Sequence, residues 1–109
     1  MSYKILTIYP FDKQLKRLAK KYPSLINDLN NLGNELEQNP FQGSLLLNNC
    51  YKIRLAISSK GKGKSGGARI ITHIHITGST VYLLAIYDKS EQSSISNKQI
   101  LQLVNIIEK

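Results

Sequence analysis

Three strand-like stretches follow one another between residues 51 and 87, and this run constrains the fold more than any other feature of the chain. Residues 51–57 alternate apolar and polar side chains, the period-2 pattern of a strand with one buried face. Residues 68–76 are rich in β-branched side chains, and Thr77-Gly78 predicts a hairpin turn into the apolar strand 79–87. The run therefore predicts an antiparallel sheet in which 79–87 is an interior strand.

The region before this run switches from strand to helical periodicity. Residues 3–9 predict a first strand, which Pro10 ends. Apolar side chains at helical spacing then predict a helix over 11–22. A second helix is predicted to begin at Pro23, where the missing N–H costs nothing, and to end at Asn39 before the next proline. The two helices are expected to form a hairpin.

The end of the chain predicts one more helix. Ser96 and Gln99 have the spacing of a capping box, and apolar residues at helical spacing follow them. The predicted fold is α+β with the order β-α-α-β-β-β-α, a helical hairpin packed on one face of the antiparallel sheet, and a C-terminal helix. The other sheet face is expected to stay partly open. A length of 109 residues suits one domain spanning 1–109.

The charge is strongly basic and concentrated. Lysine and arginine number 15 against 7 acidic residues, which gives a formal net charge of +8. No acidic residue occurs from Gln38 to Tyr87, and the cations of the central segment are Lys52, Arg54, Lys60, Lys62, Lys64 and Arg69. Such an uncompensated segment indicates a polyanionic partner, either a nucleic acid or an acidic protein. The alternative is a solvated basic surface that only aids solubility.

Membrane and secreted classes do not fit the composition. The longest apolar run, Val81–Tyr87, is far shorter than the roughly 20 residues of a membrane-spanning helix. The first residues lack the apolar stretch of a signal peptide. Cys50 is the single cysteine and cannot form an internal disulfide, so we expect a reduced thiol in the cytoplasm.

Two motifs suggest cofactors, and neither is complete. The Gly-Lys-Ser run at 63–65 resembles part of a phosphate-binding loop, but Ser58 stands where that motif needs glycine, and a strand follows instead of a helix. His73 and His75 share one strand face, but no third metal ligand is evident beside them. We therefore expect no bound nucleotide triphosphate, no metal and no small-molecule cofactor.

The predicted open face carries the candidate chemistry. Arg54 and Arg69 occupy non-core strand positions, and the loop 58–67 between their strands has four glycines and three lysines. Glycine lets a phosphate approach the backbone closely, and the cations supply charge. His73 could stack on a base or move a proton, and Tyr87 could stack on a base. The alternative for His73 is an ordinary half-exposed strand residue, and the alternative for Tyr87 is a packing residue at the sheet edge.

Three segments in fixed order resemble the RelE/ParE superfamily of bacterial type II toxin–antitoxin toxins, and the likeness is greatest to its HigB-like branch. They are Tyr51–Ile57, Lys60–Ile71 and Val81–Glu91, and the likeness extends over nearly the whole chain. The resemblance implies a small α+β toxin that cuts mRNA in the ribosomal A site without a metal. It also implies a cognate antitoxin as partner, besides the ribosome and mRNA, and a cytoplasmic location.

The resemblance also implies residue roles. By motif position, basic residues bind RNA and stabilise charge at the scissile phosphate: Arg54 and Arg69 at the catalytic centre, with Lys52, Lys60, Lys62, Lys64 and Lys89 on the RNA. The RelE type has an arginine and then a tyrosine after the last strand, whereas residues 88–99 contain neither arginine nor any aromatic. Proton transfer would then fall to Tyr87, His73 or His75, or catalysis would be weaker or absent.

Two other functions stay open at this stage. The ParE branch shares the fold and inhibits DNA gyrase without acting as a nuclease, and a plain nucleic-acid-binding member would use the same basic surface. A third alternative is an inactive member that survives only as an antitoxin partner. Ribosome-dependent cuts in mRNA would indicate the nuclease, and gyrase-linked DNA breaks with intact mRNA would indicate the gyrase inhibitor. Toxicity on induction without antitoxin would exclude the inactive member.

Overall fold

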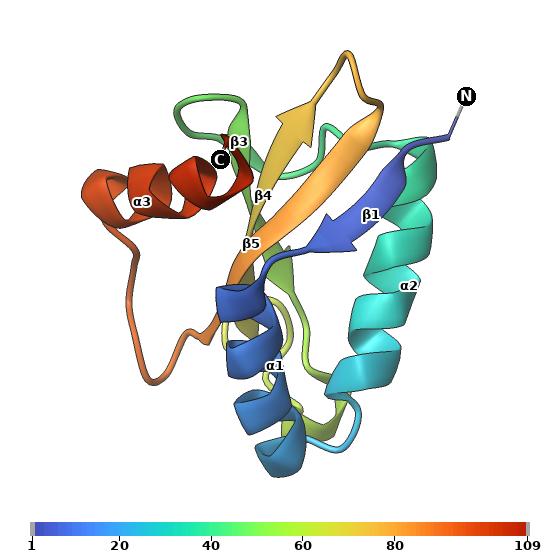
Figure 1. Ribbon diagram of the computed structural model, residues 1–109. Helices are drawn as coiled ribbons and strands as arrows, with labels where there is room; N and C mark the ends of the chain where they lie inside the picture. Colours follow the sequence, from blue (N-terminus) through green and yellow to red (C-terminus); the bar gives the residue numbers. More distant parts are fainter. Residues whose placement is uncertain (1, 109) are drawn as a thin grey trace.

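A five-stranded sheet forms the centre of the computed structural model, which describes residues 2–108 (Figure 1). The spatial order is β1-β5-β4-β3-β2. The strands are β1 (Lys4–Thr7), β2 (Ser44–Leu45), β3 (Cys50–Leu55), β4 (Ala68–His75) and β5 (Thr80–Asp88). The predicted α+β fold, the central hairpins and the interior position of 79–87 are confirmed. The sheet is mixed, however, because β1 lies parallel to β5 while all other neighbours are antiparallel.

The predicted helical hairpin is confirmed, with shifted ends. Its helices are α1 (Tyr9–Lys21) and α2 (Leu25–Gln38), and a 3-10 turn, η1 (Ser58–Lys60), follows β3. Pro10 lies in the first turn of α1, where no partner for its N–H is needed, so it does not separate strand from helix. Pro23 lies in the turn before α2 and does not begin that helix.

The capping box predicted near the C-terminus is present. The backbone N–H of Ser96 donates to Gln99 Oε1 at 3.0 Å, and the backbone N–H of Gln99 donates to Ser96 Oγ at 3.1 Å. These bonds satisfy two backbone donors that a helix start leaves unpaired. The last helix, α3 (Asn97–Glu108), begins directly after Ser96.

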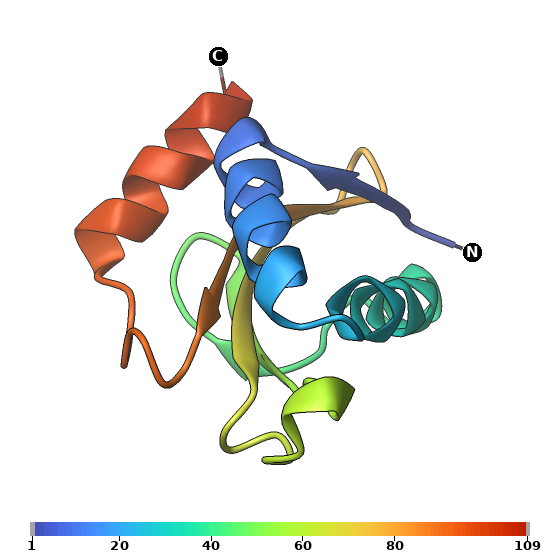
Figure 2. The same ribbon diagram turned by 90° about the horizontal axis from the view of Figure 1, so that it is seen from below.

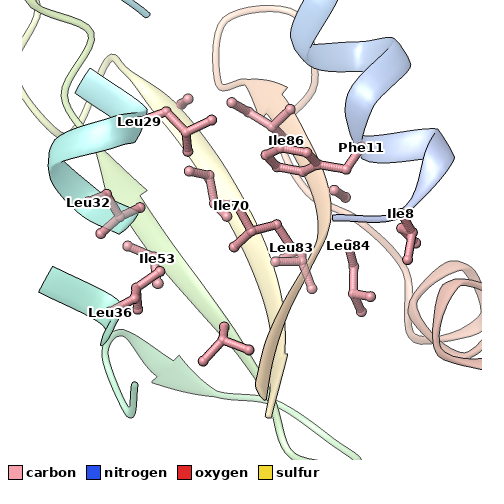
Figure 3. Packing of buried hydrophobic residues seen from close by; sticks show 14 of the residues in the cluster. Ile8, Phe11, Leu29, Leu32, Leu36, Ile53, Ile70, Leu83, Leu84 and Ile86 are labelled. Carbon is pink, nitrogen blue, oxygen red and sulfur yellow. The ribbon is translucent and has the colours of Figure 1, made fainter. Parts of the chain in front are cut away.

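The helical hairpin covers one face of the sheet. In Figure 3 the α2 side chains Leu29, Leu32 and Leu36 lie against Ile53 and Ile70 of the sheet, and Phe11 of α1 lies beside Ile86. All of these side chains are at most 9% exposed. Side chains alternate along a strand, so the residues next to Ile53, Ile70 and Ile86 on each strand point to the opposite face of the sheet.

The second face is covered more fully than we expected, although Arg54 of β3 stays exposed on it. Figure 2 shows α2 and α3 on opposite sides of the sheet, and α3 buries Ile100 and Val104. On this side α3 packs against β5, and β4 is buried on both faces from Ala68 to Ile74. The physical reason is that the apolar stripe of α3 must leave water, and the second sheet face is the apolar surface within its reach.

Candidate functional site

Three of the predicted site residues form a row across the sheet. Arg54 on β3 is the cross-strand partner of Arg69 on β4, and Arg69 is the partner of Tyr87 on β5. Side chains directly opposite one another share a face, with Cβ atoms about 4.5–5.5 Å apart. The face is the one turned away from α1 and α2. The hairpin register therefore brings together residues that are 33 positions apart in the sequence.

Arg69 is buried and holds the glycine-rich loop. Its side chain is only 5% exposed, and its guanidinium donates to the carbonyl oxygens of Lys64 at 2.9 Å, Ala68 at 3.2 Å and Ser65 at 3.3 Å. No carboxylate among residues 2–107 pairs with it. Arg69 thus fixes the backbone that carries Lys64, and its positive charge stays uncompensated.

Tyr87 is buried next to this guanidinium. The residue is 3% exposed, and within the part of the chain that the structure describes its hydroxyl has no hydrogen-bond partner. Burial raises the pKa of Tyr87, and the charge of Arg69 acts in the opposite direction. The phenol is therefore protonated at neutral pH and is a donor without an acceptor.

Backbone geometry explains two glycines of the loop 58–67. A Cβ at Gly67 would overlap the carbonyl oxygen of Leu55, so only glycine fits beside β3 there. Gly61 has a φ of 72°, in the left-handed region that other residues rarely adopt. The carbonyl of Gly67 also accepts from the backbone N–H of Lys89 at 3.1 Å. The loop is consequently tied to β3 and to the end of β5.

Lys60 does not project from the loop as a free cation. Its ammonium donates to Asp88 Oδ1 at 2.8 Å and to Ser90 Oγ at 3.1 Å, and its side chain is 14% exposed. The Tyr22 hydroxyl donates to the other oxygen of Asp88 at 2.5 Å. Burial alone would raise the pKa of Asp88, but the bonds from Lys60, Tyr22 and Ser90 lower it well below its usual range. Lys60 therefore joins the loop to α1 and β5.

Sequence reasoning missed this ion pair. Asp88 follows directly after the apolar strand predicted over 79–87, where the sequence pattern by itself indicates the first residue of a polar loop. Nothing in the spacing of Tyr22, Lys60 and Asp88 reveals the contact, because the three lie on segments that only tertiary packing brings together. Lys60, which lies in the segment 38–87 without acidic residues, is therefore paired with a carboxylate from outside that segment.

Cations that remain free line a groove at the uncovered edge of β3. The groove has a volume of about 650 Å³. Lys52, Arg54 and Lys64 line it from the sheet and the loop, while Asp28 and Glu35 of α2 line the other wall. None of the three cations makes an ion pair with a side chain of residues 2–107. The groove therefore has one basic and one acidic wall.

The acidic wall is not uniform. Asp28 accepts from the backbone N–H of Ser58 at 2.9 Å, from the Ser58 hydroxyl at 2.6 Å and from the Ser24 hydroxyl at 2.7 Å. Burial opposes ionisation of Asp28, but these bonds outweigh it and lower its pKa. Asp28 is thus an ionised carboxylate engaged in joining α2 to η1, whereas Glu35 is exposed and has no such partner.

The remaining predicted lysines are separated from this groove. Lys62 is exposed on the loop, near Gly63 with its left-handed φ of 63°. Lys89 is half-buried, and its ammonium donates to the carbonyl oxygen of Ser93 at 3.0 Å. Lys89 therefore organises the segment after β5.

The two histidines do not join the arginine row. His73 lies four residues from Arg69 on β4, about 13 Å along the strand. It is buried, with Nδ1 3.6 Å from the Cys50 sulfur. Burial raises the pKa of the Cys50 thiol to about 11. His75 lies at the exposed end of β4, where Nε2 is 3.3 Å from Thr77 Oγ1. Neither imidazole is near Arg54.

Within residues 2–108, no three histidine, cysteine, aspartate or glutamate side chains are arranged to hold a metal ion. In the same part of the chain, none of the helices combines the length and the apolar character that spanning a membrane requires.

Comparison with known proteins identifies the fold. No protein-family model matches the chain. Among solved structures, a free-state variant of the Escherichia coli toxin RelE with two arginines changed to alanine is similar with a TM-score of 0.65 and 15% identity, covering 98% of this chain and 99% of that one. The isolated Escherichia coli RelE toxin gives a TM-score of 0.58 and 17% identity, with coverage of 96% and 99%.

A third similar structure contains a complex. The toxin–antitoxin complex RelBE2 of Mycobacterium tuberculosis matches with a TM-score of 0.58 and 13% identity, covering 81% of this chain and 99% of the matched chain. These likenesses span most of the chain. The protein therefore has the fold of the RelE toxins.

Proposed function

We propose that this chain is the toxin of a bacterial type II toxin–antitoxin system, on the HigB-like side of the RelE/ParE superfamily, and that it cuts mRNA on the ribosome. The RelE fold supports the proposal. The observation that carries it is the groove at the β3 edge, where Lys52, Arg54 and Lys64 meet without an ion-pair partner among residues 2–107. The matched RelBE2 complex supports an antitoxin partner, and such a toxin acts in the cytoplasm.

Arg54 is the proposed contact to the scissile phosphate. RNA can be cut without a metal when its own 2′-hydroxyl attacks the adjacent phosphorus and the 5′-oxygen leaves. Negative charge builds on the phosphate oxygens, and a guanidinium donates to two of them at once. Arg54 is exposed and lines the groove, so its fork is available to RNA, with Lys64 as a second positive charge beside it.

Arg69 and Lys60 act in this proposal as positioning residues. Arg69 holds the carbonyls of Lys64 and Ser65, and Lys60 holds Asp88. Both therefore place the loop 58–67 without donating to RNA. An Arg69→Ala variant is expected to lose cleavage together with loop order, whereas an Arg54→Ala variant is expected to lose cleavage alone.

Tyr87 is the proposed proton donor to the leaving 5′-oxygen. Its phenol is protonated at neutral pH and lies in the row of Arg54 and Arg69. The proton of the attacking 2′-hydroxyl leaves to solvent, so the products are a 2′,3′-cyclic phosphate and a 5′-hydroxyl. The hydroxyl of Tyr87 is enclosed in the free chain, so donation requires that the residues over it move when RNA binds. The ribosome aligns the codon for in-line attack in this scheme.

Primer extension on mRNA in a translation extract tests the proposal. We expect ribosome-dependent cuts with the unaltered chain and a loss of about 10²–10³ in cleavage rate for Arg54→Ala, the usual effect of removing one charge-stabilising donor. Lys98→Ala is the matched control, because Lys98 is an exposed cation on α3, away from the groove. Cleavage by Arg54→Ala at the rate of the control would overturn the site assignment.

The enclosed hydroxyl of Tyr87 favours a second candidate function. A chain whose titratable groups beside the arginines are buried suits a non-catalytic inhibitor, such as a ParE-like gyrase inhibitor or a nucleic-acid-binding protein. Intact mRNA together with gyrase-linked DNA breaks would establish the gyrase inhibitor. RNA binding without either effect would establish the binding protein.

A further inference from the structure

The outer face of α1 carries an aromatic residue and three lysines in one row. Tyr9, Lys13, Lys16 and Lys20 follow the spacing i, i+4, i+7 and i+11. At about 100° per residue these positions fall on one face of a helix. The opposite face of α1 is the one that buries Phe11 and Leu18. We call the four residues the α1 row.

Every member of the α1 row is exposed. Tyr9 is 74% exposed, the largest exposed fraction among the large hydrophobic side chains of the described residues. Lys13, Lys16 and Lys20 are exposed too, and none makes a hydrogen bond or ion pair with a side chain of residues 2–107. The nearby cations Arg17 and Lys21 differ, because both pair with Glu91, at 3.0 Å and 3.4 Å. The free charge of α1 is thus concentrated in the row.

The arrangement is electrostatically unfavourable until an anion binds. Like charges three or four residues apart repel on a helix surface, and Lys13, Lys16 and Lys20 are spaced in that way. The only acidic residue in α1 is Asp12. A polyanion lying along the row would relieve this repulsion.

The composition of the row fits single-stranded nucleic acid best. Proteins bind single strands by combining cations that follow the backbone with aromatic rings on which bases stack. The lysines span about 10 Å along the helix at 1.5 Å per residue, a length suited to a few phosphates. An exposed tyrosine continues this line, and a duplex offers it no unstacked base.

An apolar hollow lies beside the lysines of the row. Its volume is about 480 Å³, and it is lined by Leu15, Ala19 and Ile26 together with Lys16, Lys20 and one carboxylate, Asp12. A base that turns away from the backbone could rest in it while its phosphates contact the lysines. An acidic polypeptide would neutralise the lysines, but it carries no regularly spaced bases to stack on Tyr9.

We propose that the α1 row binds a single-stranded nucleic acid, with Tyr9 stacking on a base and Lys13, Lys16 and Lys20 contacting phosphates. This surface is separate from the groove at β3, because the groove and the hollow beside the row share no lining residue. The inference does not depend on cleavage. A strand could contact this surface whether or not the groove cuts it.

Tyr9→Trp provides a local reporter of binding, because the chain contains no tryptophan. We expect oligo-uridine RNA to quench the fluorescence of this variant, and oligo-thymidine DNA as a parallel ligand shows whether the 2′-hydroxyl contributes. Placing Tyr9→Trp in an Arg54→Ala background removes the proposed contact in the groove. Quenching that persists there belongs to α1, and its loss there would overturn the separation of the two surfaces.

The lysines are tested by charge-matched variants in the reporter background. Lys16→Gln with Lys20→Gln should weaken RNA binding about tenfold and lower the log–log salt slope by about 1.4, from roughly 0.7 per phosphate contact on a single strand. Lys4→Gln with Lys98→Gln removes the same charge from exposed sites elsewhere and should weaken binding less than twofold. Equal losses in the two pairs, absence of quenching by RNA and DNA, or tighter binding of poly-glutamate than of RNA would each overturn the proposal.

Discussion

Arg54 and Arg69 lie directly opposite one another on β3 and β4, and no carboxylate of residues 2–107 pairs with either. Like charges in this position repel, so the pair costs stability in the free chain. The guanidinium of Arg69 donates its hydrogen bonds to loop carbonyls, whereas the side chain of Arg54 lines the groove. The two arginines therefore make a place where a bound phosphate lowers the energy of the protein.

Removing Arg54 should change stability and activity in opposite directions. We expect Arg54→Ala to raise the free energy of unfolding by about 0.2–1 kcal/mol, because a cross-strand repulsion is removed from an exposed position. The same variant should lose RNA cleavage. Urea unfolding monitored by circular dichroism measures the first effect. A fall in stability of more than 1 kcal/mol would show that the side chain has a structural role.

Lys60 should matter for folding more than for RNA affinity. Lys60→Met removes the nearest ammonium from the buried carboxylate of Asp88 and leaves only the half-exposed Lys21, at 3.8 Å, as a cationic partner. We expect a loss of about 2 kcal/mol in the free energy of unfolding. Adding Asp88→Asn should recover most of that loss, because the uncompensated charge is removed. If Lys60→Met keeps full stability and loses RNA binding, the ammonium contacts RNA as the sequence predicted.

Asp88 should make the fold sensitive to acid. Its pKa is lowered in the folded chain, so the unfolded chain binds more protons once the pH falls below about 5. The stability that Asp88 contributes is fully present above its unfolded pKa, near 3.9, and is lost as the pH falls toward its folded pKa. Urea midpoints at pH 6 and pH 3 should show a smaller decrease for Asp88→Asn than for the unaltered chain. Equal decreases would mean that Asp88 titrates normally in the fold.

Tyr87→Phe separates a chemical role of the hydroxyl from a packing role. A buried hydroxyl without a partner is unfavourable, so we expect the phenylalanine variant to be more stable by about 1 kcal/mol. Loss of the proposed proton donor should lower cleavage by about 10²–10⁴ at the same time. A stable variant that cuts mRNA at the original rate would exclude Tyr87 as the donor.

Removing the charge of Glu35, on the acidic wall of the groove, should raise the affinity of the protein for RNA. Glu35 faces Lys52, Arg54 and Lys64 across the groove and repels a phosphate that enters it. Glu35→Gln should tighten RNA binding about two- to fivefold, as expected from about 0.5–1 kcal/mol for an exposed charge interaction. Fluorescence anisotropy with a labelled RNA measures this, and Asn34→Gln, an exposed change on the same helix without a change in charge, is the control. Weaker binding of Glu35→Gln would argue against RNA in the groove.

Local patterns in the sequence were sufficient for most of the fold. The alternation in 51–57, the Thr77-Gly78 turn and the capping box at Ser96 each depend on neighbours within a few residues. The turn and the capping box appear as predicted, and the strand is present with shifted ends, as Cys50–Leu55. The pairing of Arg54 with Arg69 is not among these features, because the connection 56–67 between their strands is too long to fix the register by itself. These features are determined locally, because strand alternation, turn geometry and helix capping act over short stretches of chain.

The closure of the second sheet face and the partner of Lys60 were decided only by tertiary structure. α3 covers a face that periodicity left open, since an apolar stripe does not show which surface will bury it. Lys60 meets Asp88 and Tyr22 because β3, β5 and α1 end at the same place, which no spacing in the sequence encodes. The sequence by itself determined which segments became strands and helices and that the cations are concentrated. Packing decided which of those cations stay free to bind a phosphate, because burial and long-range ion pairing depend on segments that meet only in the folded chain.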